Sequence, residues 1–176
     1  MEPITEWIKY LLPSLVVLLT TWLLVRHYFR NIGKTQDHEA RMKALSRSLP
    51  IQLQAYERLA LLLERITVDN LLVREQMPEM TARQFHQHLL AMVRAEFEHN
   101  LSQQIYVSSE AWSVVRNARE GVIKLVNSAA VQVDPDGSAL ELSKKIIEIQ
   151  MEIEASPTMA ALEFLRKEAR YLMGIH

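Results

Sequence analysis

The sequence predicts an all-α protein in which an N-terminal transmembrane helix is followed by a roughly five-helix cytoplasmic bundle. Three observations lead to this fold class. The chain has 176 residues, of which 49% are hydrophobic and only 4 are Gly, a composition that favours helices. A long stretch near the N-terminus carries no charge, and downstream of it the apolar residues recur at three- and four-residue spacings.

The uncharged stretch covers residues 10–25, YLLPSLVVLLTTWLLV. As a helix it rises about 24 Å at roughly 1.5 Å per residue, which is less than the roughly 30 Å of a bilayer core. Extension to residue 4 closes this difference if Lys9 places its ammonium among the headgroups. We therefore expect a span over residues 4–25 within an anchor of residues 1–30, followed by a juxtamembrane linker helix over residues 31–50.

Basic residues follow the uncharged stretch, whereas only Lys9 precedes it. The positive-inside rule then places the N-terminus outside and the C-terminal domain in the cytoplasm. Arg26, Arg30 and Lys34 are close enough to the predicted span to contact anionic lipid headgroups. The other interpretation is that these three cations only set the topology.

Residues 51–176 are predicted to form the helical bundle, because apolar periodicity alternates there with helix start and stop signals. About 125 residues in five antiparallel helices can bury one core. The first signals are a helix start or kink at Ser48 and Pro50 and a short helix over residues 67–76 capped by Thr67 or Asp69. Capping boxes at Thr81/Gln84 and Ser138/Glu141 and a cap at Ser108 or Ser109 predict three further helix starts. A turn is expected over residues 134–137, and the last helix should begin at Pro157 and end at Gly174.

Several function classes are disfavoured by what the sequence lacks. It has no Cys, so it has no disulfide, thiolate metal site or thiol nucleophile. The net charge of −1 and the absence of a basic patch with interleaved aromatics argue against nucleic acid as a partner. There is no phosphate-binding Gly loop, nucleophile elbow or zinc-protease motif. We expect no enzymatic activity, no cofactor and no small-molecule substrate.

Charged pairs at a seven-residue spacing provide the main candidate for a docking surface. Glu57-Arg58 and Glu64-Arg65 repeat on one predicted helix, so each residue type forms a stripe. One interpretation is a polar docking strip or an internal ion network with Arg74 or Arg94; the other is an ordinary solvated face.

A second docking candidate is Trp112, because Trp is enriched at binding hot spots. Its spacing equally fits a buried core position. The candidate docking residues are Glu57, Arg58, Glu64, Arg65, Arg74 and Trp112.

Two alternative functions remain open. Glu96-x-x-His99 with Glu64 is part of the residue set of a di-metal carboxylate enzyme, although such sites require a second Glu-x-x-His pair. The other interpretation places Glu96 and His99 in solvent near a helix end. Alternatively, the chain is an accessory subunit whose span packs in a membrane complex through Ser14, Thr20 and Thr21.

The stretch AYERLALLLERITVDNLLVR, residues 55–74, together with the N-terminal apolar segment and the helical region that follows, resembles an uncharacterised family of bacterial single-span membrane proteins. This resemblance implies a location in the bacterial inner membrane and says nothing about activity. The resulting hypothesis is a membrane-tethered helical module that binds a protein partner or a second copy of itself.

Overall fold

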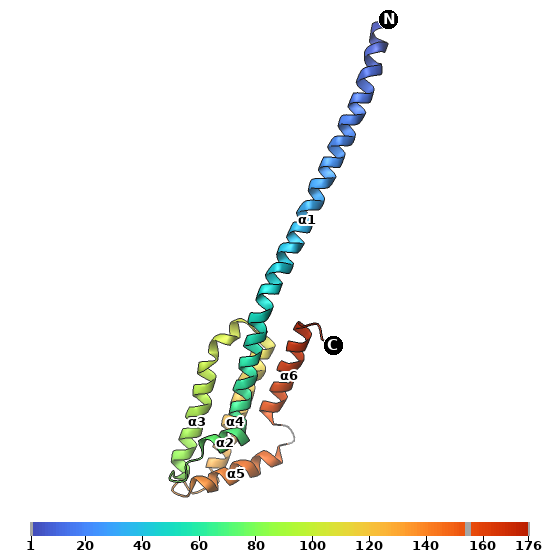
Figure 1. The fold of residues 1–176 in the computed structure, drawn as a ribbon. Coiled ribbons are helices and arrows are strands. Elements are labelled where there is room, and N and C mark those ends of the chain that lie inside the picture. Colours follow the sequence, from blue (N-terminus) through green and yellow to red (C-terminus); the bar gives the residue numbers. More distant parts are fainter. Residues whose placement is uncertain (1, 154–155, 176) are drawn as a thin grey trace. The chain divides into compact units, whose positions relative to one another are not determined.

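The computed structural model describes residues 2–153 and 156–175, and the side chains of residues 15–27, 47–153 and 156–175. Helices are the only regular elements among the described residues, which confirms the all-α prediction. The chain divides into two compact units, Met1–Ser48 and Leu49–His176. The elements, shown in Figure 1, are α1 (Glu2–Ile66), α2 (Val68–Glu75), α3 (Ala82–His99), the 3₁₀ helix η1 (Leu101–Ile105), α4 (Ser109–Ala130), α5 (Ala139–Glu152) and α6 (Pro157–Leu172).

The predicted transmembrane anchor is the main correction to the fold class. In the described part of the chain, no helix combines the length and the apolar character that crossing a bilayer requires. The uncharged run of residues 10–25 is short for this purpose, at about 24 Å against roughly 30 Å. Extension to residue 4 would bring Glu6 and Lys9 into the segment. The prediction of a span over residues 4–25 is therefore wrong.

The predicted linker helix of residues 31–50 lies within helix α1. Helix α1 continues without interruption through Ser48 and Pro50 to Ile66, so no new helix begins at this point. A proline inside a helix removes one backbone hydrogen bond. Because Pro50 is exposed, water can bond the carbonyl group that loses its partner.

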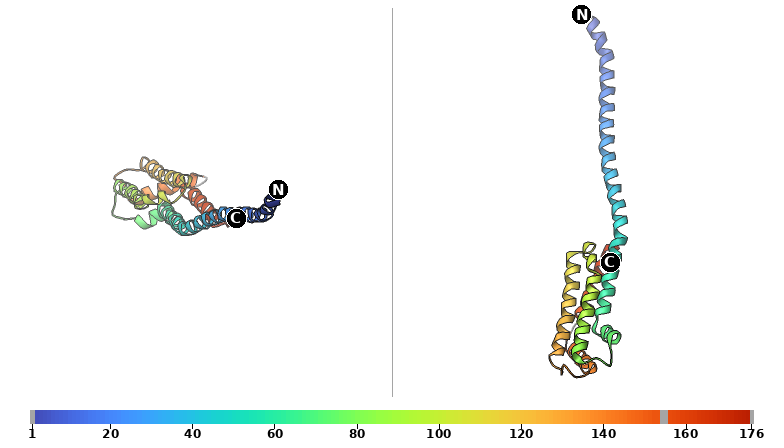
Figure 2. Two further views of the ribbon diagram at one scale, coloured as in Figure 1. Left: turned by 90° about the horizontal axis from the view of Figure 1, so that it is seen from above. Right: turned by 90° about the vertical axis from the view of Figure 1, so that its left-hand side faces the viewer.

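The unit Leu49–His176 is a helical bundle with a single apolar core. Helix α4 packs against α3, α5 and α6, and α5 also packs against α2 and α3. Figures 1 and 2 show α3 and α4 beside the last turns of α1, with α5 across one end of these helices. The largest fully buried side chains include Leu59, Leu62, Leu63, Ile66, Phe85, Leu89, Val93, Val115, Leu142, Ile146 and Leu165.

The helix ends of this unit follow the predicted signals closely. The capping box of α3 is complete, because Gln84 N donates to Thr81 Oγ1 at 3.3 Å and Thr81 N donates to Gln84 Oε1 at 3.0 Å. Ser108 and Ser138 cap α4 and α5 through their hydroxyl groups. After α6, Gly174 adopts the positive φ of 71° that a left-handed C-cap requires.

Side chains of Thr67 and of α2 close the end of α1. Thr67 Oγ1 and Asn70 Nδ2 donate to the Glu64 carbonyl at 2.7 and 2.8 Å, and Arg74 Nη1 donates to the Arg65 carbonyl at 3.2 Å. The last carbonyls of a helix have no partner within the helix. These bonds satisfy two of them and hold α2 against α1, which brings Arg74 close to Arg65.

Candidate functional site

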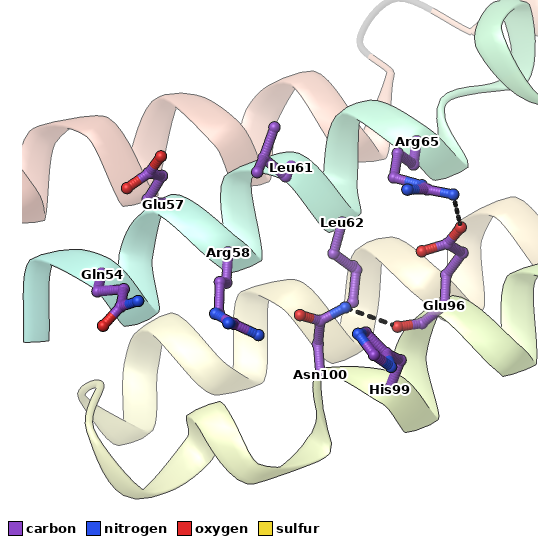
Figure 3. A pocket seen from close by; sticks show the side chains of 9 residues that line it. All are labelled: Gln54, Glu57, Arg58, Leu61, Leu62, Arg65, Glu96, His99 and Asn100. Atoms are coloured by element: carbon purple, nitrogen blue, oxygen red, sulfur yellow. Dashed lines mark hydrogen bonds and ion pairs between the residues drawn. The ribbon is translucent and has the colours of Figure 1, made fainter. Parts of the chain in front are cut away.

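A hollow of about 340 Å³ lies between the last turns of α1 and the C-terminal end of α3. Figure 3 shows Arg58 and Leu62 extending from α1 toward His99 and Asn100. Leu62, at 1% exposure, contributes a buried apolar surface to the hollow, and Leu61 is 56% exposed. The lining residues are Gln54, Glu57, Arg58, Leu61, Leu62, Arg65, Glu96, His99 and Asn100.

Three predicted docking residues therefore meet two residues of the alternative metal hypothesis. Glu57, Arg58 and Arg65 come from α1, whereas Glu96 and His99 come from α3. The sequence places each set on its own helix, and packing of α1 beside α3 brings them to one surface.

An ion network connects three helices beside this hollow. The Arg65 guanidinium lies 2.7 Å from Glu96 Oε1, and Arg74 Nη2 lies 3.9 Å from the same oxygen. The predicted network with Arg74 is thus present, but its central carboxylate is Glu96 of α3. Charge-assisted hydrogen bonds of this kind hold side chains in one geometry, so Arg65 is committed to a structural contact.

The network extends from Arg74 to Glu75 and His88. Arg74 Nε lies 2.6 Å from Glu75 Oε1, and His88 Nε2 lies 2.9 Å from Glu75 Oε2. Burial alone would raise the pKa of the Glu75 carboxyl, but the hydrogen bonds and charges of Arg74 and His88 outweigh it and lower this pKa below 4.5. Glu75 thus remains ionised and joins α2 to α3.

In contrast, the side chains of Glu57, Arg58 and His99 make no hydrogen bond or ion pair with any other residue that the structure describes. All three are exposed. A guanidinium with its five donors unused can bind a carboxylate through two parallel hydrogen bonds. Arg58 is therefore the cation of the hollow that is available for an external anion.

Two predicted docking residues lie outside the hollow. Glu64 faces Arg166 of α6, whose guanidinium lies 3.8 Å away. Trp112 is half-buried against the core, with its ring centroid 5.2 Å from that of Phe97. Arg119 covers the same Phe97 ring at 4.3 Å. Trp112 consequently serves packing between α3 and α4.

The residues of the di-metal hypothesis do not form one cluster. Among the described residues, no three His, Asp or Glu side chains lie close enough to hold a metal ion. Glu96 already binds two guanidinium groups, and Glu64 lies outside the hollow that Glu96 and His99 line. Arginine cations at the Glu96 carboxylate compete directly with a metal for its oxygens.

The remaining sequence candidates belong to the N-terminal part of α1. Arg26 lies over the Trp22 ring at 5.1 Å. The Thr20 and Thr21 hydroxyls donate to carbonyls of their own helix, at 2.9 and 2.7 Å, and so use their hydrogen-bonding capacity locally. The side chains of Ser14, Arg30 and Lys34 lie outside the described residues.

Sequence reasoning missed two polar residues of the hollow, Gln54 and Asn100. Asn100 is only 7% exposed, and its side-chain amide donates to the Glu96 carbonyl at 2.9 Å. It is the C-cap residue of α3 and directly follows His99. An Asn directly after a predicted helix is a common sign that the helix ends there. This pattern could have identified Asn100 from the sequence.

Comparison with known proteins gives one relationship. A family model described as "Family of unknown function (DUF7935)" matches residues 2–172. No curated protein and no solved structure matches the chain. The match covers α1 to α6 and therefore includes both sides of the hollow. The chain belongs to the DUF7935 family of unknown function.

Proposed function

We propose that the unit Leu49–His176 is a protein-interaction module that binds a carboxylate-bearing segment of a partner in the hollow between α1 and α3. The observation that supports this most directly is the contrast between its two arginines. Arg65 is paired with Glu96 at 2.7 Å, whereas Arg58 lines the same hollow without a partner among the described residues. A partner carboxylate at Arg58 would complete the charge pairing of this surface.

The rest of the lining supports a protein partner. Exposed Leu61 and buried Leu62 offer apolar contact beside the polar groups of Gln54 and His99. Apolar surface surrounded by hydrogen-bonding groups is the usual composition of a protein interface. Glu57, which also lines the hollow, adds an anion that selects against a uniformly acidic partner.

The membrane-tethered form of the hypothesis depended on the transmembrane span and is not carried forward. The bacterial origin implied by the resemblance remains a prediction. The ion pairs at Glu96 and Glu64 disfavour the di-metal alternative, because each carboxylate already faces a guanidinium group.

Crosslinking of the full-length chain in its native cells, followed by mass spectrometry, tests the proposal. We expect a near-stoichiometric companion linked to peptides that contain residues 54–65 and 96–100. Arg58→Glu should remove the companion, because it places an anion where the partner carboxylate binds. Arg116→Glu, a charge reversal at an exposed position of α4 outside the hollow, is the matched control and should retain it.

Two outcomes would contradict the proposal. A companion retained by Arg58→Glu at the wild-type level would show that the hollow is not the docking surface. Links that map only to α5 or α6 would place the interface elsewhere on the unit.

Links between two copies of the chain at residues 54–65 would identify the partner as a second copy.

A further inference from the structure

A second hollow, of about 270 Å³, lies on a different part of the same unit. Tyr56 of α1 lines it together with Tyr106 and Ser108, which lie between η1 and α4, and Glu168 of α6. The docking function proposed above uses none of these residues. The Ser108 amide donates to the Tyr56 hydroxyl at 3.4 Å, which holds the segment before α4 against α1.

Glu168 forms no ion pair with a cation among the residues that the structure describes. Its Oε2 atom is buried and has no hydrogen-bond partner in the described part of the chain. Two nearby cations of α6 are directed elsewhere, because Arg166 faces Glu64 at 3.8 Å and Lys167 faces Glu163 at 3.9 Å. Burying a carboxylate oxygen without a hydrogen-bond partner is unfavourable. A cation in the hollow would relieve this cost.

The negative charge of Glu168 also affects Tyr56. Burial of the Tyr56 phenol raises its pKa above 10.0, and the nearby Glu168 carboxylate raises this pKa further. Among the residues that line the hollow only Glu168 is charged, so the neutral phenol and the carboxylate together favour a cation there. Tyr106, 43% exposed, adds a second aromatic ring, and the faces of such rings attract cations.

The remaining lining residues indicate the shape of the ligand. Ile105, Val107 and Leu172 provide apolar contacts, which suit methylene groups. The volume is below the roughly 300–1,000 Å³ of sites for drug-sized ligands. A short aliphatic chain that ends in an ammonium group therefore fits the size, the charge and the apolar lining.

We propose that the hollow between α1, α6 and the segment before α4 binds the ammonium group of a small aliphatic amine through Glu168 and the two tyrosines. The ammonium donates hydrogen bonds to the Glu168 carboxylate and lies near the aromatic rings. The alkyl chain contacts Ile105 and Leu172. Binding involves no covalent step.

The test is a titration of the ¹⁵N-labelled full-length chain with n-butylammonium, followed by NMR. We expect saturable shifts of the amides of residues 106–108 and 168. The neutral analogue 1-pentanol, of similar length, should shift them at least tenfold less at the same concentration. Equal shifts from both compounds would overturn the proposal, because they would show apolar binding without recognition of the ammonium.

Two variants test the role of the carboxylate. Glu168→Gln keeps the side-chain shape but removes the charge, and should weaken butylammonium binding at least tenfold. Glu163→Gln removes an exposed carboxylate of the same helix and should leave binding within twofold of wild type. Wild-type affinity in a folded Glu168→Gln variant would overturn the proposal. If that variant does not fold, Tyr106→Leu replaces it, with at least threefold weaker binding expected and wild-type affinity as the contradicting result.

A lysine analogue with blocked backbone groups tests whether the bound ammonium belongs to a free amine or to a lysine side chain of a protein. Weaker binding than butylammonium supports a free amine, because the added amide groups do not fit the hollow. Tighter binding overturns the assignment to a small amine and indicates a lysine side chain of a protein instead.

Discussion

Arg58 and Arg65 lie seven residues apart on α1, yet their surroundings give them different roles. Arg65 pairs with Glu96, whose side chain is 16% exposed, and Arg58 has no partner among the described residues. The seven-residue repeat indicates that both face the same side of the helix. It cannot show which of them meets a carboxylate of α3, because that depends on the packing of two helices that are distant in sequence.

Alanine substitution should separate these roles. Arg65→Ala should lower the free energy of unfolding by about 0.5–1 kcal/mol, since the pair it removes is partly exposed. Arg58→Ala should change this free energy by less than about 0.5 kcal/mol, because it removes no internal contact. Urea denaturation of the two variants measures both values. A larger loss for Arg58→Ala than for Arg65→Ala would contradict these assignments.

Glu75 makes a pH-dependent contribution to stability. Its pKa is lower in the folded state than the ordinary value of 4.5. Its stabilising effect is therefore fully present above pH 4.5 and is lost as the pH falls through the folded-state pKa. We expect Glu75→Gln to be less stable than wild type at pH 7 and to approach it below pH 4.5. Urea denaturation between pH 3 and pH 7 tests this, and a constant difference over the whole range would contradict it.

At the scale of elements, local signals predict the helix ends well and the continuity of helices poorly. The caps at Thr81, Ser108 and Ser138 are present because each uses atoms within three residues of its own position. Of the start or kink expected at Ser48 and Pro50, the start does not occur, because the 65-residue helix α1 continues through both residues. The 3₁₀ helix η1 was not predicted, because Leu101–Ile105 carries no capping pattern.

Gly121 marks a close contact between α4 and α6. A Cβ atom at this position would lie 2.8 Å from Pro157 Cγ and 2.9 Å from Pro157 Cβ. Alanine would gain about 1 kcal/mol of helix propensity, but overpacking against a proline ring costs about 1–3 kcal/mol. We expect Gly121→Ala to lower the free energy of unfolding by about 1 kcal/mol.

Thermal or urea denaturation measures this effect. Ser128→Ala, at an exposed position of the same helix, is the control and should be neutral or slightly stabilising. An equal gain in stability from both substitutions would show that α4 and α6 do not approach as closely as the structure indicates.

At the scale of the whole molecule, the sequence predicts an all-α chain and most of the core, but not how the site is assembled. Glu57, Arg58, Arg65, Glu96 and His99 were all identified as polar candidates. They were divided between two unrelated hypotheses, because the contact between α1 and α3 is not encoded in local spacing. The span prediction was wrong because an apolar run of 16 residues was extended through charged positions to reach bilayer length.

The central claim is that Arg58 binds a carboxylate of a protein partner. Its most direct test is the dissociation constant of the purified full-length chain and its crosslinked companion, measured for wild type, Arg58→Lys and Arg58→Glu. A lysine keeps the charge but loses the two parallel hydrogen bonds, so we expect affinity to fall about tenfold for Arg58→Lys and at least a hundredfold for Arg58→Glu. An Arg58→Glu variant that binds within twofold of wild type would contradict the claim.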